Sequence, residues 1–211
     1  MMRADLTVSG TVQSVGFRPF VYRVATHRGL VGHVRNRGDA GVGIRLYGDR
    51  STIEAAIAVI MEEPPPLADV RDVDIEWMAV DAVPDRFTID PSSDAAGAAG
   101  SLPPDTAPCE RCLTELADPS GHFGGYWGIS CVDCGPRYTI TRSLPYDRAQ
   151  TSLDAFPLCE RCQQRFDDPQ SRRYHAQAIA CAACGPELWA ADTTDAAQIS
   201  ARGPAAVASV A

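Results

Sequence analysis

Eight cysteines carry the clearest chemical pattern in this 211-residue chain. They form two cassettes of the pattern C-x2-C-x18-C-x2-C, and the second repeats the first 50 residues later. Two C-x-x-C turns can surround one ion with four thiolates, so the spacing predicts two zinc sites. Because protein atoms fill each site, we expect the zinc to be structural. The ligands are Cys109, Cys112, Cys131 and Cys134 in one cassette, and Cys159, Cys162, Cys181 and Cys184 in the other.

Several readings of the cassettes stay open. Four disulfides are the main alternative, but the chain begins with no apolar run of the signal-peptide type, which favours a reducing, cytoplasmic setting. The repeat would also permit ligands to be exchanged between cassettes. Since four cysteines fill each site, His122 and His175 are expected outside the ligand sets, and the pair Arg172-Arg173 on a solvated face. A glycine follows each last cysteine, which suits a knuckle with positive φ.

A second candidate site lies in the loop that ends at Arg18. The backbone N–H groups from Val15 to Arg18 precede a predicted helix, and a helix N-terminus attracts anions. The Arg18 guanidinium can bind two phosphate oxygens at once. Asn36, at the end of the next predicted strand, could serve the same site. Taken singly, an ordinary loop and an ordinary turn asparagine explain these positions.

The surrounding pattern predicts the elements that position this loop. Residues 6–12 alternate as a strand, a helix follows from Pro19 to Gly29, and strands are expected at 31–36 and 42–46. A capping box at Ser51 opens the clearest helix, and residues 73–77 form a fourth strand. The order βαββαβ predicts a ferredoxin-like α+β sandwich, with two helices on one face of an antiparallel sheet. A short fifth strand is expected at residues 86–89.

The loop and the second strand together resemble the acylphosphatase family. The resemblance implies that Arg18 binds an acyl phosphate, that Asn36 orients the attacking water, and that the phosphate-binding residues are Val15, Gly16, Phe17 and Arg18. Ser14 stands where the family usually has glycine, and serine costs about 1 kcal/mol if φ there is positive. The quoted motifs are Gly10-x-Val12-Gln13-x-Val15-Gly16-Phe17-Arg18 and Gly32-x-Val34-x-Asn36.

These features divide the chain into four parts. Residues 1–92 form the acylphosphatase-like domain, and 93–104 form a linker rich in Ser, Ala, Gly and Pro. Residues 105–188 form the tandem module with two C4 zinc sites, whose folding we expect zinc to decide, since one site contributes on the order of 10 kcal/mol. Residues 189–211 form a tail without a motif, expected to be the truncated start of a nucleotide-binding domain.

Charge and composition argue against two classes of partner. The formal net charge is −8, and every base is an arginine. The chain therefore lacks the basic character of a nucleic-acid-binding protein. Its longest apolar runs are too short to span a membrane. We expect neither nucleic acid nor membrane as a partner.

The order of domains and several motif runs resemble the N-terminal part of the HypF carbamoyltransferases of [NiFe]-hydrogenase maturation. The resemblance implies hydrolysis of carbamoyl phosphate here, ATP use in later domains absent from this chain, and a HypE-type partner that receives the carbamoyl group, which becomes a cyanide ligand of iron. The first cassette departs from the pattern at residues 122–130. The runs are Cys134–Ile140, Leu144–Arg148, Thr151-Ser152 and Arg172–Gln177.

Two other functions fit the same residues. The chain could be a general acylphosphatase with an appended zinc module, which comparison of carbamoyl phosphate with a simple acyl phosphate would reveal. It could also be a non-catalytic zinc interaction module whose N-terminal domain only binds anions. The Ser14 variant loop favours the latter, and a protein that binds phosphate without hydrolysis would support it.

Overall fold

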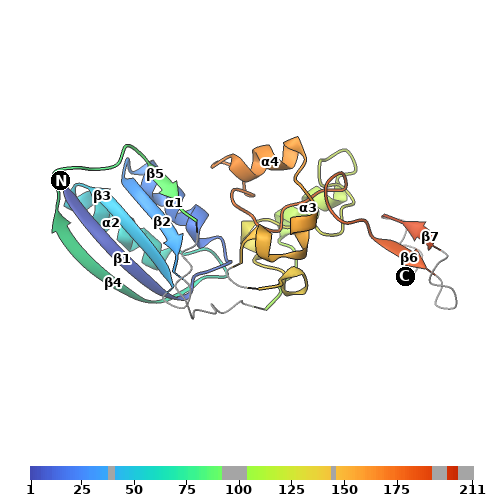
Figure 1. Ribbon diagram of the computed structural model, residues 1–211, viewed down its shortest axis with the longest axis horizontal. Helices are drawn as coiled ribbons and strands as arrows, with labels where there is room; N and C mark the ends of the chain where they lie inside the picture. The colour runs from blue at the N-terminus through green and yellow to red at the C-terminus, as the bar shows by residue number, and fades with distance from the viewer. Residues whose placement is uncertain (38–40, 92–103, 144–145, 192–198, 204–211) are drawn as a thin grey trace.

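The computed structural model describes residues 1–37, 41–91, 104–143, 146–191 and 199–203. These residues form two bodies side by side and a small hairpin beyond them (Figure 1). The first body, here called the N-terminal domain, contains strands β1–β5 and helices α1 and α2. The second, here called the cysteine module, contains helices α3 and α4 and all eight cysteines. Most of the predicted linker lies outside the described residues.

Five strands form the sheet of the N-terminal domain, in the order β4-β1-β3-β2-β5. Neighbours are antiparallel except that β5 runs parallel to β2. The predicted ferredoxin-like fold is confirmed, but the sheet is mixed because the fifth strand returns alongside β2. The strands are β1 (Met2–Thr11), β2 (Val31–Asn36), β3 (Val42–Gly48), β4 (Asp69–Ala79) and β5 (Phe87–Ile89).

Helices α1 (Phe17–His27) and α2 (Arg50–Glu62) share one hydrophobic core with the sheet. The apolar alternation of the strands and the helical spacing of α2 both point into it, as the sequence predicted. Burying these side chains anchors both ends of the loop that joins β1 to α1. The core includes Leu6, Val8, Val15, Phe17, Val21, Val34, Ile44, Leu46, Ile53 and Ile60.

The ends of the two helices differ in detail from the prediction. The predicted capping box at Ser51 is wrong, because the N-cap of α2 is Asp49, two residues earlier, and the helix begins at Arg50. Pro19 is the third residue of α1 and not the first. It still lies in the first turn, where the missing amide has no helical partner to lose. Gly29 follows the end of α1 with φ 66°, as a glycine at this position permits.

The sequence repeat appears in the cysteine module as two short helices that begin 50 residues apart. Helix α3 (Glu110–Ala117) is N-capped by the first cysteine of its cassette, and α4 (Glu160–Asp167) by the first cysteine of the other. Short 3-10 helices connect the rest: η2 (Val132–Cys134), η3 (Tyr138–Ile140), η4 (Arg148–Gln150) and η5 (Ser152–Ala155).

The glycines after the two cassettes serve different needs. Gly135 has φ 69°, the left-handed value expected of the knuckle. The φ of Gly185 is not positive, so the prediction is wrong there. A Cβ at Gly185 would lie 2.0 Å from the Tyr126 hydroxyl. That glycine therefore permits close packing and not an unusual backbone angle.

The N-terminal domain contacts the cysteine module through helix α1. The Arg18 Nη2 donates a hydrogen bond to the Asp147 Oδ1 at 3.1 Å. The rings of Tyr22 and Tyr174 lie with centroids 5.2 Å apart. The buried side chains of the two bodies form separate hydrophobic clusters.

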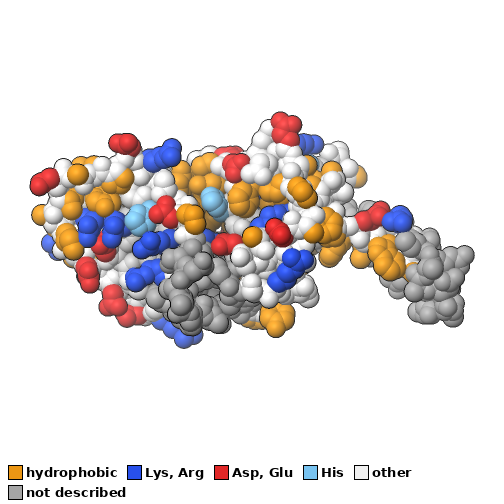
Figure 2. All heavy atoms as spheres, in the orientation of Figure 1, with side chains coloured by type: hydrophobic (Ala, Val, Ile, Leu, Met, Phe, Trp, Pro, Cys, Tyr) orange, Lys and Arg blue, Asp and Glu red, His pale blue; other side chains and the backbone are white. Residues whose placement is uncertain are grey.

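The predicted tail contains a hairpin of β6 (Trp189–Ala191) and β7 (Ile199–Arg202), which the sequence pattern did not reveal. None of the helices in the described part of the chain is both long and apolar enough to cross a membrane. On the face drawn in Figure 2, acidic and basic side chains are interspersed over both bodies. Charge on that face is therefore mixed.

Candidate phosphate and metal sites

The loop between β1 and α1 contains two residues with positive φ directly before the helix. Gly16 is the N-cap of α1 with φ 76°, and Ser14 has φ 65°. Val15 and Phe17 are buried in the N-terminal core, with exposures of 0% and 2%. Burying alternate side chains holds the backbone in one conformation at the helix start. A helix N-terminus held in one conformation is the kind of place where backbone N–H groups can receive an anion.

The two predicted catalytic residues belong to different elements, and of the two only Arg18 is among the residues that line the cavities at this loop. Arg18 is the second residue of α1, and Asn36 is the last residue of β2 with an exposure of 1%. Both β1 and β2 are antiparallel to β3, so they run in the same direction and their C-terminal ends lie at the same end of the sheet. The Gln13 Nε2 in the loop donates to the carbonyl oxygen of Gly41 at 3.0 Å, which joins the loop to the turn after Asn36.

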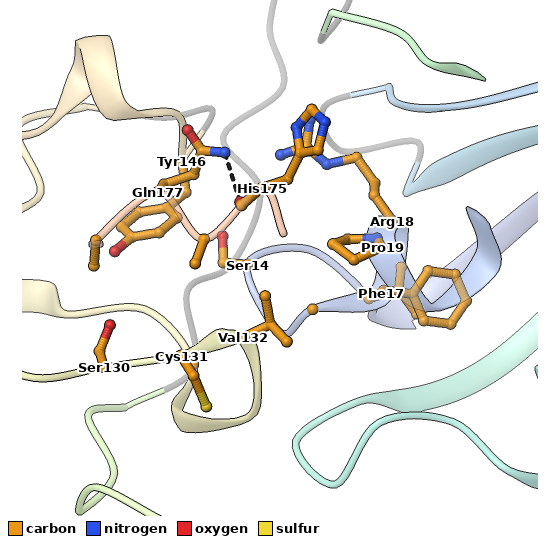
Figure 3. A pocket seen from close by; sticks show the side chains of 15 residues that line it. Ser14, Phe17, Arg18, Pro19, Ser130, Cys131, Val132, Tyr146, His175 and Gln177 are labelled. Carbon is orange, nitrogen blue, oxygen red and sulfur yellow. Dashed lines mark hydrogen bonds between the residues drawn. The ribbon is translucent and has the colours of Figure 1, made fainter. Parts of the chain in front are cut away.

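The loop faces the cysteine module across a small cavity of about 40 Å³ (Figure 3). Ser14, Gly16 and Arg18 line one side, and Ser130, Tyr146, His175 and Gln177 are among the residues on the other. A wider hollow of about 470 Å³ continues past Arg18 and His175. The loop between β1 and α1 is therefore covered by the cysteine module, which the sequence did not predict.

His175 and Asp147 are the residues at this junction that sequence reasoning missed. Burial and, less strongly, the charge of Arg18 lower the pKa of His175. His175 has φ 54° and, with Ser14, is one of two non-glycine residues with positive φ in the described ranges. Gln177 donates from Nε2 to the His175 carbonyl oxygen at 2.7 Å. The only signal in the sequence was that both residues belong to the motif runs quoted above.

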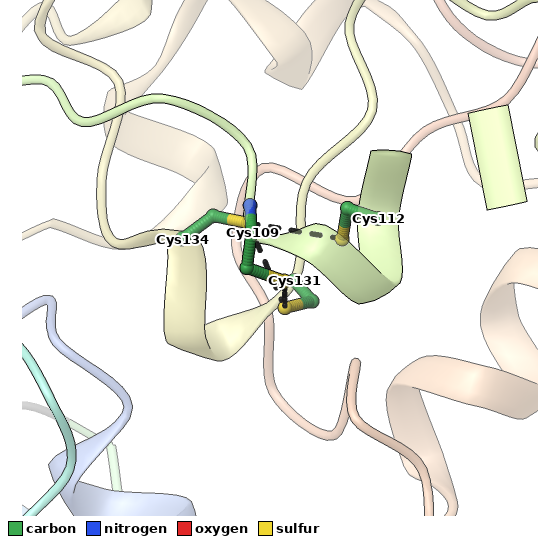
Figure 4. Close-up of side chains that lie close together, drawn as sticks. All are labelled: Cys109, Cys112, Cys131 and Cys134. Carbon is green, nitrogen blue, oxygen red and sulfur yellow. Dashed lines mark hydrogen bonds between the residues drawn. The ribbon is translucent and has the colours of Figure 1, made fainter. Parts of the chain in front are cut away.

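Four sulfur atoms of the first cassette converge from both of its C-x-x-C turns (Figure 4). Cys131 Sγ lies 3.8 Å from Cys109 Sγ and 3.7 Å from Cys134 Sγ. A tetrahedral zinc ion with bonds of about 2.3 Å would separate its sulfurs by about 3.8 Å. The backbone N–H of Cys109 also donates to Cys134 Sγ at 3.3 Å. The donor set and its spacing therefore fit zinc.

The second cassette forms a similar cluster with one addition. Cys181 Sγ lies 3.8 Å from Cys159 Sγ and 3.7 Å from Cys184 Sγ. His122 comes from the first cassette, yet its Nε2 lies 3.2 Å from Cys162 Sγ, so the residue expected to be outside the ligand set contacts it. All eight cysteines are free thiols in the structure.

The expectation that Arg172 and Arg173 form a solvated face is wrong. Arg173 is 1% exposed and its guanidinium lies 3.6 Å from the centroid of the Phe123 ring. Both arginines pair with Glu115. Burial alone would raise the pKa of Glu115, but the hydrogen bonds from Arg173 and Arg172 outweigh it and lower the pKa.

Comparison with known families assigns the two bodies separately. Residues 4–89 match the Acylphosphatase family, and residues 109–141 and 158–190 match the HypF finger. An acylphosphatase of Archaeoglobus fulgidus is 40% identical over 76 residues, which cover 36% of this chain and 84% of that protein. The N-terminal domain thus corresponds to nearly all of a small acylphosphatase.

The combination of the two bodies matches a larger class of protein. Carbamoyltransferase HypF2 of Cupriavidus necator is 45% identical over 157 residues, or 74% of this chain and 19% of that protein. The crystal structure of full-length HypF in the phosphate- and nucleotide-bound form superposes with a TM-score of 0.81 and 37% identity, covering 92% of this chain and 26% of that one. The chain thus spans about a fifth to a quarter of these relatives. It belongs to the acylphosphatase family, and the two HypF fingers that follow its acylphosphatase domain make it an N-terminal HypF-like region.

Proposed function

We propose that this chain hydrolyses carbamoyl phosphate at the loop Val15–Arg18, as the first step of a HypF-type carbamoyltransferase. The observation that carries the proposal is the cradle itself: a left-handed turn at Gly16, a helix N-terminus and the Arg18 guanidinium meet at one place. Carbamoyl phosphate is a small dianionic acyl phosphate. Its recognition needs local positive charge, which these groups supply.

The chemistry requires little beyond positioning and charge neutralisation. Water attacks the phosphorus, the bond from phosphorus to the acyl oxygen breaks, and carbamate leaves with the electron pair of that bond. Arg18 and the N–H groups of Val15–Arg18 stabilise the phosphoryl oxygens, and Asn36 orients the water. In the structure, the Asp147 carboxylate forms an ion pair with the Arg18 guanidinium. An incoming phosphate would compete with it.

We further propose that each cysteine cluster holds one structural zinc ion, in the reducing environment of the cytoplasm. Eight thiolates supply four ligands per ion, so no coordination position is left for catalytic water. ATP would act only in domains beyond this chain. A HypE-type protein would receive the carbamoyl group, which is destined to become a cyanide ligand of the [NiFe]-hydrogenase iron.

One observation favours a second function. The N-terminal domain matches a free-standing acylphosphatase over nearly the whole length of that protein: one relative is 33% identical over 98% of its length. A general acylphosphatase with an appended module is therefore the competing proposal. A non-catalytic module that binds phosphate is the third.

Phosphate release from carbamoyl phosphate and from acetyl phosphate separates these proposals. A HypF-type site should give the higher kcat/KM with carbamoyl phosphate. Equal or higher kcat/KM with acetyl phosphate would favour a general acylphosphatase. Binding of inorganic phosphate without hydrolysis of either compound would favour the non-catalytic module. Arg28→Ala, at the far end of α1, is a matched control for Arg18→Ala.

A further inference from the structure

The internal repeat places equivalent residues of the two cassettes next to each other's cysteines: each residue contacts the cluster of the other cassette. Residues 122 and 172 occupy the same place in their cassettes, 50 residues apart. Arg172, of the second cassette, lies on the sulfurs of the first: its Nη1 is 3.4 Å from Cys131 Sγ and 3.7 Å from Cys109 Sγ. His122, of the first cassette, lies on Cys162 of the second. Each loop thus reaches the other cluster.

The first cluster receives a second cation as well. Arg173 Nη2 lies 3.8 Å from Cys112 Sγ, while its Nε donates to the Ser130 carbonyl oxygen at 2.9 Å. Glu115 supplies one negative charge against the two arginines. Because a buried guanidinium needs a counter-charge, the thiolates of the first cluster provide the remainder. Four thiolates around one divalent ion carry a net charge of about −2, so the arginines offset that excess.

The contact of His122 has the geometry of a hydrogen bond to sulfur. Nitrogen and sulfur bound to the same zinc ion would lie about 3.5 Å apart, from bond lengths of about 2.0 and 2.3 Å. The observed separation of His122 Nε2 and Cys162 Sγ is shorter, 3.2 Å. Cys184 Sγ, 3.7 Å from Cys181 Sγ, already supplies a fourth sulfur. A ring nitrogen of His122 also lies within 4.8 Å of the Cys159, Cys162 and Cys181 sulfurs, so its role as a donor and not a ligand rests on the four-cysteine set of the cassette.

We propose that the two cassettes stabilise each other's metal site by exchanging N–H donors, and that the first site, which has two guanidinium donors, retains its metal longer than the second. The proposal rests on the zinc sites proposed above but not on the proposed hydrolysis. N–H donors lower the charge density on thiolates and so weaken their reaction with protons and electrophiles. Losing such an outer partner typically costs about 10- to 100-fold in metal affinity.

The decisive experiment measures which cysteines respond when one donor is removed. The zinc-loaded chain is treated with a chelator and a thiol-alkylating reagent, and the labelled peptides are followed by mass spectrometry. In the unmodified protein the second cluster should be labelled first. Arg172→Ala should speed labelling of Cys109, Cys112 and Cys131 by at least about tenfold. The cysteines of its own cassette should change by less than about twofold.

Matched variants distinguish the loss of a hydrogen-bond donor from a general loss of stability of the cysteine module. Arg142→Ala removes an exposed arginine of the cysteine module that lies between the two cassettes, and it should leave both clusters unchanged. Arg172→Lys retains the charge with fewer donors and should fall between the wild type and Arg172→Ala, which keeps the test usable if the alanine variant unfolds. Faster labelling confined to the second cassette in Arg172→Ala, or no change in either, would overturn the proposal.

The reciprocal contact has its own readout. His122→Ala should speed labelling of the second cluster and leave the first unchanged. In the cobalt-substituted chain, the charge-transfer and ligand-field bands should indicate four sulfur ligands at both sites, before and after this substitution. A band shift in His122→Ala that indicates loss of a nitrogen ligand would overturn the donor role. A chain that binds no metal would overturn the proposal together with the zinc sites.

Discussion

Ser14→Gly should stabilise the N-terminal domain, because Ser14 holds a backbone angle that suits glycine. Its φ is 65°, in the left-handed region, within the loop that precedes α1. A residue with a Cβ pays about 1–2 kcal/mol in that region. Glycine loses about 0.5–1 kcal/mol of this gain through the greater freedom of the unfolded chain. The expected net gain in the free energy of unfolding is therefore about 0.5–1 kcal/mol.

Amide hydrogen exchange in β3 provides the assay. This central strand pairs with both β1 and β2, so its slowest amides report opening of the whole N-terminal domain. Exchange of these amides should slow by roughly two- to fivefold in Ser14→Gly, since about 1.4 kcal/mol corresponds to tenfold. Hydrolysis of acyl phosphate should rise by no more than a similar factor, because the strain energy that is relieved limits the gain.

Ser14→Ala is the matched control. Alanine keeps the Cβ and removes only the hydroxyl, so the backbone strain remains and the exchange rates should stay near those of the wild type. If Ser14→Gly and Ser14→Ala gave the same exchange rates, the strain argument would fail. Faster exchange in Ser14→Gly would show that the serine side chain stabilises the loop instead.

Four further outcomes follow from the same contacts. Asn36→Ala should lower kcat more than phosphate affinity, because it removes the group that positions water and leaves the phosphate-binding groups in place. Steady-state kinetics with phosphate as inhibitor would measure both quantities. A loss of phosphate affinity with unchanged kcat would contradict this role. Asp147→Asn should tighten phosphate binding by about two- to fivefold in calorimetry, since this partly buried ion pair should contribute at least the roughly 0.2–1 kcal/mol of a surface pair. Chelation should unfold the cysteine module while circular dichroism and exchange show the N-terminal domain intact; joint unfolding would contradict this. Burial and the charge of Arg18 lower the pKa of His175, so as the pH falls the imidazole is protonated in the unfolded chain before it is protonated in the folded chain. The free energy of unfolding should therefore fall as the pH drops below about 6.5. His175→Gln should reduce this dependence on pH.

Local periodicity was enough to predict the N-terminal domain. The alternation of β1 and β3 and the helical spacing of α2 follow directly from which side chains are buried. The mixed sheet was not predictable, since the direction of the short strand β5 depends on the path of the chain and not on its own residues. The N-cap at Asp49 was missed because Ser51 offered an equally good local signal.

The cysteine clusters and the loop show where local signals end. The C-x-x-C spacing identified the two sulfur clusters, but not the residues that surround them. Arg172 and His122 act across the repeat, on cysteines of the other cassette, and no local pattern marks such a pairing. In the same way Asp147 reaches Arg18 from 129 residues away. Contacts between bodies depend on their packing, which the sequence pattern alone does not describe.

The dependence of carbamoyl phosphate hydrolysis on Arg18 tests the central claim most directly. The zinc-loaded chain should release phosphate from carbamoyl phosphate, with inorganic phosphate as a competitive inhibitor, and Arg28→Ala should match the wild type. Arg18→Ala should lose measurable turnover and bind phosphate more weakly, because the chain contains no lysine that could replace the guanidinium. Unchanged hydrolysis and unchanged phosphate affinity in Arg18→Ala would contradict the assignment of this loop as the phosphate site.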